Sequence, residues 1–173
     1  MASSRGNPAL GDILRSVLVM GLIILALWGF GQFFTRTPDQ PTRSIDYAKT
    51  VRDVRAAADY PVLAPPSLPD GWRATSARYN RGNQGWHLGV LSDDDEYVGL
   101  EQSKDTVKES LDDFAPGGEG AGSAQVAGTV WQVSVSEDDR LTYVSEKDGV
   151  TTLVTTSGDQ ALLEAYVESL TSE

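Results

Sequence analysis

The sequence predicts an α+β protein, in which an N-terminal transmembrane helix is followed by an antiparallel sheet with helices packed on one of its faces. Three observations support this fold class. Residues 16–34 contain no ionisable side chain. From Trp72 onward, short runs of alternating apolar and polar residues are separated by turn residues, as in antiparallel strands. Two later segments repeat their apolar residues with a helical period instead.

The segment Ser16–Phe34 is predicted to cross a membrane. As an α-helix its 19 residues would extend roughly 28 Å, close to the ~30 Å of a bilayer's hydrocarbon core. The apolar run is longer than that of a secretory signal, and no small-x-small cleavage site follows it. We therefore expect a tail at residues 1–15, a juxtamembrane linker at residues 35–44 and one folded domain at residues 45–173.

The charges beside this span leave its orientation open. Arg5 and Arg15 precede it, whereas Arg36, Arg43 and Lys49 follow it, which slightly favours a cytoplasmic C-terminus under the positive-inside rule. However, Arg15 adjoins the membrane directly, and long domains are translocated largely regardless of charge.

The domain is expected to begin with a helix and an extended strap. Residues 45–58 carry an apolar residue at three-residue steps, and Ser44 is a candidate N-cap, so a helix is predicted there. Residues 60–71 contain four of the eight prolines, which excludes a helix or a central strand. The apolar side chains of this segment suggest a strap that packs on the domain.

The remainder of the chain is expected to form two groups of strands, each closed by a helix. In the first group, strands are predicted at 72–80, 86–92 and 96–102, with a helix at 106–114. In the second group, strands are predicted at 130–136, 141–146 and 150–156, with a helix at 160–170. Both groups contain Trp, alternating residues, an acidic turn and Tyr-Val, which suggests two βββα halves. The Gly-rich segment Gly117–Ser123 is interpreted as a flexible connector between them.

Composition excludes several classes of function. Arg5, Arg15 and Asp12 are the only charged residues before residue 35, so 12 of the 14 basic and 24 of the 25 acidic residues follow it. Such an acidic domain disfavours binding to nucleic acid or to anionic lipid headgroups. Because the chain has no cysteine, disulfides, thiol nucleophiles and thiolate metal sites are excluded.

No residue is assigned a catalytic, cofactor-binding or metal-binding role. His87 is the only histidine, and the sequence supplies neither a nucleophile motif nor an orienting partner for it, so we expect it on the solvent or rim face of a strand. The acidic runs Asp93–Glu96 and Glu137–Asp139 would attract Ca²⁺, but they lack the ligand spacing of a calcium loop. Solvated turns explain them better.

The strand aromatics allow two interpretations. They are Trp72, Tyr79, Trp86, Tyr97, Trp131 and Tyr143. Aromatic residues in strands most often belong to the core. The alternative is that they line a ligand groove or a surface that contacts a partner.

The chain also resembles a known family. The resemblance lies in Pro61–Leu63, in Leu68–Arg73 (LPDGWR), in Ser76–Tyr79 (SARY) and in Trp86. With these motifs the chain is similar to the actinobacterial single-span membrane proteins grouped as domain of unknown function 4245. The resemblance implies a plasma-membrane protein of the cell envelope with a cytoplasmic N-terminus and an extracytoplasmic domain. It implies no activity and no catalytic residues.

These observations predict a membrane-anchored, non-enzymatic protein without a cofactor. The expected role is to bind a partner protein or to serve as an accessory subunit of a membrane complex. The alternative is an extracytoplasmic domain that binds a small ligand or a lipid. A hydrolase or metal-dependent enzyme is disfavoured because no nucleophile–base pair is visible in the sequence.

Overall fold

The computed structural model describes residues 15, 17–21, 23 and 44–173. Of the predicted membrane span, residues 17–21 and 23 are helical, and its other residues lie outside the described part, as do the linker up to residue 43 and the tail before residue 15. Within the described residues, no helix is long and apolar enough to cross a membrane. The chain divides into two compact units, residues 1–41 and 42–173.

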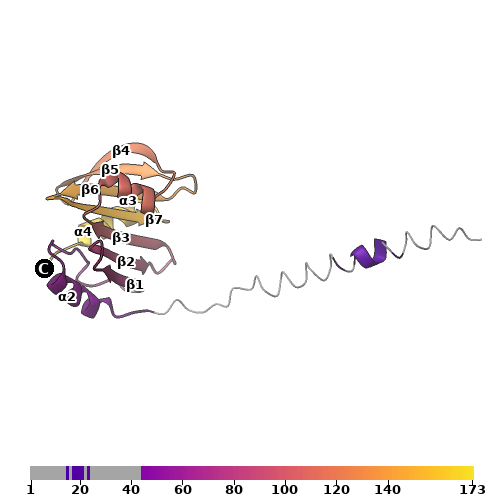
Figure 1. The fold of residues 1–173 in the computed structure, drawn as a ribbon, viewed down its shortest axis with the longest axis horizontal. Helices are drawn as coiled ribbons and strands as arrows, with labels where there is room; N and C mark the ends of the chain where they lie inside the picture. The colour runs from indigo at the N-terminus through magenta and orange to yellow at the C-terminus, as the bar shows by residue number, and fades with distance from the viewer. Residues whose placement is uncertain (1–14, 16, 22, 24–43) are drawn as a thin grey trace, which may run out of the picture. The chain divides into compact units, whose positions relative to one another are not determined.

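The second unit contains three helices and one seven-stranded antiparallel sheet with the strand order β1-β2-β3-β7-β6-β5-β4 (Figure 1). The helices are α2 (Tyr47–Ala57), α3 (Val107–Phe114) and α4 (Gln160–Ser169). The strands are β1 (Arg73–Asn80), β2 (Gly85–Leu91), β3 (Tyr97–Ser103), β4 (Glu119–Val126), β5 (Thr129–Val135), β6 (Leu141–Lys147) and β7 (Val150–Thr156).

The helices begin where polar side chains satisfy their first backbone N–H groups. Asp46, rather than the expected Ser44, caps α2 by accepting from the Ala48 N–H. Thr106 and Glu109 form a reciprocal capping box at the start of α3. Asp159 accepts from the Leu162 N–H at the start of α4. All three predicted helices are confirmed, with ends that differ by no more than two residues.

The prediction of a flexible connector at Gly117–Ser123 is wrong. Most of this segment belongs to β4, which pairs with β5 along its length and contains a bulge between Gly120 and Gly122. A tight turn produces the hairpin, since Ala127 and Gly128 both have positive φ, 51° and 75°. The second half therefore has four strands before its helix, and the prediction of two βββα halves fails in this half.

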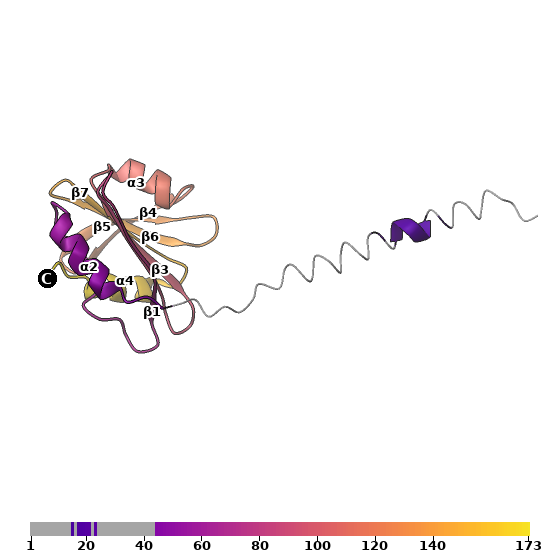
Figure 2. The same cartoon turned by 60° about the horizontal axis from the view of Figure 1, so that its bottom comes forward.

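Helices cover both faces of the sheet, so the prediction that all of them pack on one face is also wrong. Successive residues of β7 point to opposite faces. Val154 belongs to the core cluster that contains Leu163 of α4, whereas Leu153 packs with Leu111 of α3. Figure 2 shows α3 on one side of the strands and α2 and α4 on the other. We call these two sides the α3 face and the α4 face.

The predicted strap at residues 60–71 is confirmed as an extended segment packed on the domain. Val62 is buried, and the Leu63 carbonyl accepts a hydrogen bond of 2.9 Å from Nε1 of the fully buried Trp86. The strap also pairs with the C-terminus, because Ala64 and Thr171 exchange backbone hydrogen bonds. Strap, α2 and C-terminus together cover the α4 face of the sheet.

Candidate functional site

A groove of about 560 Å³ lies on the α4 face. It lies between the strap, the sheet and the end of α4. Its lining includes Thr129, Trp131, Ser145 and Thr152 from three strands. Leu63 of the strap and Val167 and Leu170 at the end of α4 add apolar surface. Its volume falls within the range of small-molecule sites, about 300–1,000 Å³.

Gln102 holds one wall of this groove in place. Its side-chain carbonyl accepts a 2.7 Å hydrogen bond from the Leu63 N–H, and its amide donates to Thr152 Oγ1 at 3.1 Å. Because Gln102 is itself buried, its two contacts fix the strap to the sheet at a set distance. The groove is thus a preformed feature of the fold.

Two lysines line the groove. Lys104 Nζ lies 2.6 Å from Asp59 Oδ2, and this hydrogen bond lowers the pKa of the Asp59 carboxyl. Lys147 is exposed, and within residues 44–173 it has no carboxylate within ion-pair distance. The Lys147 ammonium is therefore available to an anionic group of a ligand.

Most of the strand aromatics belong to the core or pack against it, Trp131 also lines this groove, and Tyr97 lies on the opposite face. Trp86 is buried in the core, and Trp72 stacks on Tyr166 with ring centroids 6.3 Å apart. Trp131 lines the groove, while its Nε1 donates to the Val126 carbonyl. The core interpretation is correct for most of them, and the groove interpretation applies to Trp131.

A row of three polar side chains crosses β1, β2 and β3 on the α3 face. His87 Nε2 lies 2.7 Å from Ser76 Oγ, and His87 Nδ1 contacts Glu101 Oε1. We call these residues the Ser76 row. No partner for His87 was visible in the sequence, whereas the structure supplies two. The alternation of each strand predicts which of its residues share a face. It does not predict the relative register of the three strands, which brings these side chains together.

Tyr97 lies beside the Ser76 row, over two glycines. A Cβ atom on Gly89 would lie 2.6 Å from Ser76 Oγ and 3.1 Å from the Tyr97 hydroxyl. A Cβ atom on Gly99 would lie 2.8 Å from the same hydroxyl. Burial raises the pKa of Tyr97, as does the Glu101 carboxylate, against an opposing effect of Arg78 and Arg140. The phenol therefore stays protonated and is a hydrogen-bond donor at neutral pH.

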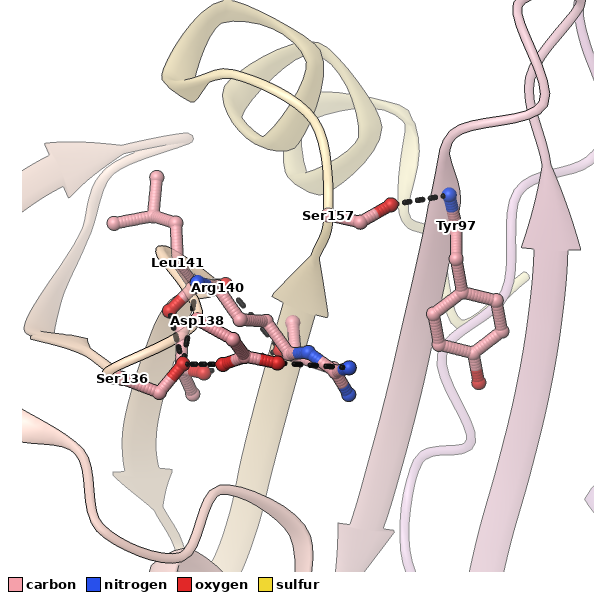
Figure 3. A network of polar contacts seen from close by, with 8 residues as sticks. Tyr97, Ser136, Asp138, Arg140, Leu141 and Ser157 are labelled. Carbon is pink, nitrogen blue, oxygen red and sulfur yellow. Dashed lines mark hydrogen bonds and ion pairs between the residues drawn. The ribbon is translucent and has the colours of Figure 1, made fainter. Parts of the chain in front are cut away.

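The acidic runs form turns, as predicted. Asp95 pairs with Arg73, and Asp138 accepts from Ser136 Oγ and lies 3.4 Å from Arg140 Nη2. Figure 3 shows the Arg140 side chain extending from this turn toward Tyr97. Within the part of the chain that the structure describes, no group of three or more His, Asp or Glu side chains is placed to hold a metal ion.

A smaller cavity of about 250 Å³ adjoins this turn at the end of α3. Phe114 and Pro116 line it on one side, and Ser134, Arg140 and Thr142 line it on the other. It does not include any member of the Ser76 row. The two cavities and the row are thus separate features of the sheet.

Together these features define an α+β domain with a preformed groove on one face of its sheet and a Ser–His–Glu row on the other. The model of a family described as protein of unknown function (DUF4245) matches residues 5–170, and the chain belongs to this family. The resemblance of the sequence motifs to domain of unknown function 4245 is thereby confirmed. No curated protein matches the chain.

Proposed function

We propose that the chain is a single-pass cell-envelope protein, with its N-terminus in the cytoplasm, whose extracytoplasmic domain binds a small amphipathic ligand in the groove on the α4 face. The apolar span of the sequence supports the anchor. The groove supports the ligand, and it favours this role over the partner-protein role expected first from the sequence.

The observation that carries the proposal is the chemistry of the groove. Val167, Leu170 and Leu63 offer apolar surface, whereas Lys147 offers an ammonium group. An acyl or aromatic body with one anionic group satisfies both parts. Binding to a mostly apolar concave site with a few fixed polar groups is the usual pattern of ligand recognition. Among the groove residues no nucleophile lies next to a base, so we assign the groove binding and no catalysis.

The test is native mass spectrometry of the full chain, extracted from its own membranes with mild detergent. We expect a reproducible adduct of a small molecule on the wild-type protein. The variant Thr129→Trp, which fills the groove from the start of β5, should lose this adduct. Its matched control is Val130→Trp, because this adjacent residue points to the opposite face and is 64% exposed. A bare wild-type mass, or an equal adduct on Thr129→Trp, would contradict the proposal.

A partner-protein role is the second candidate, and β4 favours it. The sheet has two edge strands, β1 and β4. Edge β1 is partly covered, since the Ile45 N–H donates to the Ala74 carbonyl. In contrast, six of the eight β4 residues are exposed, and within residues 44–173 no strand pairs with its outer side. Such an edge accepts an extended segment of another chain by strand addition.

A photo-crosslinking amino acid at Ala121 of β4 tests this second candidate in intact cells. We expect one adduct of defined mass. The control position is Gly82, in the exposed turn between β1 and β2. No adduct from position 121, or the same adducts from both positions, would remove the strand-addition role.

A further inference from the structure

The Ser76 row lies on the face opposite the groove, and the proposed binding function does not use it. It contains a hydroxyl, an imidazole and a carboxylate in contact, in that order. From this geometry we propose that Ser76 is the nucleophile of an esterase site, with His87 as its base and Glu101 as the group that orients the base.

The partners of His87 fix which of its ring nitrogens carries the proton. An ionised carboxylate can only accept a hydrogen bond, so in the neutral ring the proton lies on Nδ1 and is donated to Glu101. Nε2 then has a free lone pair and accepts the Ser76 O–H at 2.7 Å. This arrangement of an activated hydroxyl, a base and an orienting third group is the signature of nucleophilic catalysis.

The surroundings favour reaction at Ser76 Oγ rather than at His87. The His87 and Glu101 side chains are each only 15% exposed, so their contact is protected from water. Ser76 is partly exposed. Gly89 and Gly99 have no side chains of their own beside it, and the Tyr97 ring lies over both glycines. A Cβ atom on Gly89 would lie 2.6 Å from the Ser76 hydroxyl and 3.1 Å from the Tyr97 hydroxyl, so the two hydroxyls face the same space.

Tyr97 supplies the donor that the reaction needs. Negative charge develops on the carbonyl oxygen of an ester when a hydroxyl attacks it, and a preorganised side-chain donor stabilises that charge. The Tyr97 phenol is protonated at neutral pH, and both Arg78 and Arg140 act on it electrostatically. Tyr97 is therefore placed to donate to the oxyanion.

The reaction is hydrolysis of a carboxylic ester. Ser76 Oγ attacks the carbonyl carbon while its proton passes to His87 Nε2. The ester C–O bond breaks, and the leaving alkoxide takes that proton and departs as the alcohol. Water then attacks the acyl group and gives a proton to His87 Nε2. The acid is released, and the proton returns to Ser76.

The test uses the full chain in detergent, a fluorophosphonate probe and intact-mass detection. The probe's P–F bond breaks as Ser76 Oγ bonds to phosphorus, fluoride leaves, and His87 takes the proton. We expect one label, mapped to Ser76 by peptide analysis and absent from Ser76→Ala. Loss of the base in His87→Gln should slow labelling about 10²–10⁴-fold. Ser123→Ala, at an exposed serine of β4, is the matched control and should label like the wild type.

The pH profile separates an activated serine from a row that only stabilises the sheet. The pH dependence of labelling should differ between the wild type and His87→Gln, because only the wild type carries the base. Glu101→Asp, which keeps a carboxylate, should label faster than Glu101→Gln. Circular dichroism confirms that each variant is folded. If folded wild-type protein takes no label at Ser76, or if His87→Gln labels at the wild-type rate, the esterase site is disproved and the row is structural only. The result is independent of the groove, because the adduct test at Thr129 does not involve this face.

Discussion

At the scale of single residues, Gly99 is the clearest case in which the absence of a side chain has a structural role. The Tyr97 ring lies over it, and an added Cβ atom would approach the ring to 2.8 Å at the hydroxyl and 3.0 Å at Cε1. A Cβ atom on Gly89 would likewise lie 3.1 Å from Cε2 and from the hydroxyl of Tyr97, so the ring occupies the space over both glycines. Glycine here keeps Tyr97 beside Ser76.

We predict that Gly99→Ala destabilises the domain by about 1–3 kcal/mol, the usual cost of inserting a methyl group into a packed site. Urea unfolding followed by tryptophan fluorescence measures this difference. Gly120→Ala is the control, because a Cβ atom at Gly120 meets nothing within 4 Å, and its effect should stay within about 0.5 kcal/mol. Equal stability of Gly99→Ala and the wild type would show that Tyr97 moves freely.

The Ser76 row shows why single residues were harder to interpret than strands. Alternation predicts which residues of one strand share a face, but contacts between strands depend on register, and a shift of one residue reverses the face. Here His87 pairs with Glu101 and Arg78, and the extra residue Thr75 forms a bulge before Ser76. Neither pairing nor bulge has a local sequence signal, so the Ser76 row could not be assembled from the chain alone.

At the scale of elements, the start of α3 combines a capping box with a charge. Glu109 Oε2 accepts from the Thr106 backbone N–H at 2.9 Å and from its hydroxyl at 2.7 Å. These hydrogen bonds, the backbone one first, lower the pKa of Glu109 below its usual 4.5. A carboxylate at a helix N-terminus is also favoured by the helix dipole.

The lowered pKa of Glu109 determines how the stability of the domain changes with pH. Because the pKa of Glu109 is lower in the folded state, its contribution is fully present above about pH 4.5 and is lost as the pH falls through the folded-state pKa. We predict that Glu109→Gln melts below the wild type at neutral pH and that the two melting temperatures converge in acid. Thermal melts across this pH range measure the difference. Glu168→Gln, at an exposed site of α4, is the control, and a constant gap for Glu109→Gln would refute the argument.

The elements that the sequence predicted are those whose signals are local. Strand alternation, caps and the proline-rich strap each depend on neighbouring residues, and these predictions agree with the structure within a few residues. The Gly-rich β4 lacks β-branched and aromatic residues at its centre, and only pairing with β5 makes it a strand. The side on which α3 packs is set by β7, which is buried on both faces, and no pattern within α3 reveals that.

At the scale of the whole molecule, the two halves differ in topology although their sequences share a pattern. The first half runs β1-β2-β3-α3, and the second runs β4-β5-β6-β7-α4. The two sets meet where β3 pairs with β7. Trp86 and Trp131 both belong to the core cluster of the α4 face, yet α3 and α4 pack on opposite faces. The repeated Trp and Tyr-Val pattern therefore reflects similar strand environments, and a simple copy of one half does not reproduce the other.

The function of the groove and of the Ser76 row depends on which side of a membrane the domain occupies. We predict that the N-terminus lies in the cytoplasm and that residues 35–173 lie outside it. The reasons are the short tail with Arg15 next to the apolar span, the translocation of long acidic domains regardless of charge, and the family resemblance. Arg36, Arg43 and Lys49 favour the reverse orientation, so a direct measurement is needed.

A cysteine placed at Asp94 provides that measurement, because this position is exposed in the turn between β2 and β3 and the chain has no other cysteine. With a membrane-impermeant maleimide, Asp94→Cys should be labelled in intact cells. Ser3→Cys, in the N-terminal tail, should be labelled only after the membrane is permeabilised. The reverse pattern would place both the groove and the Ser76 row in the cytoplasm, where their ligands would come from cytoplasmic molecules. Labelling of both positions in intact cells would show that the apolar segment does not separate them across a membrane.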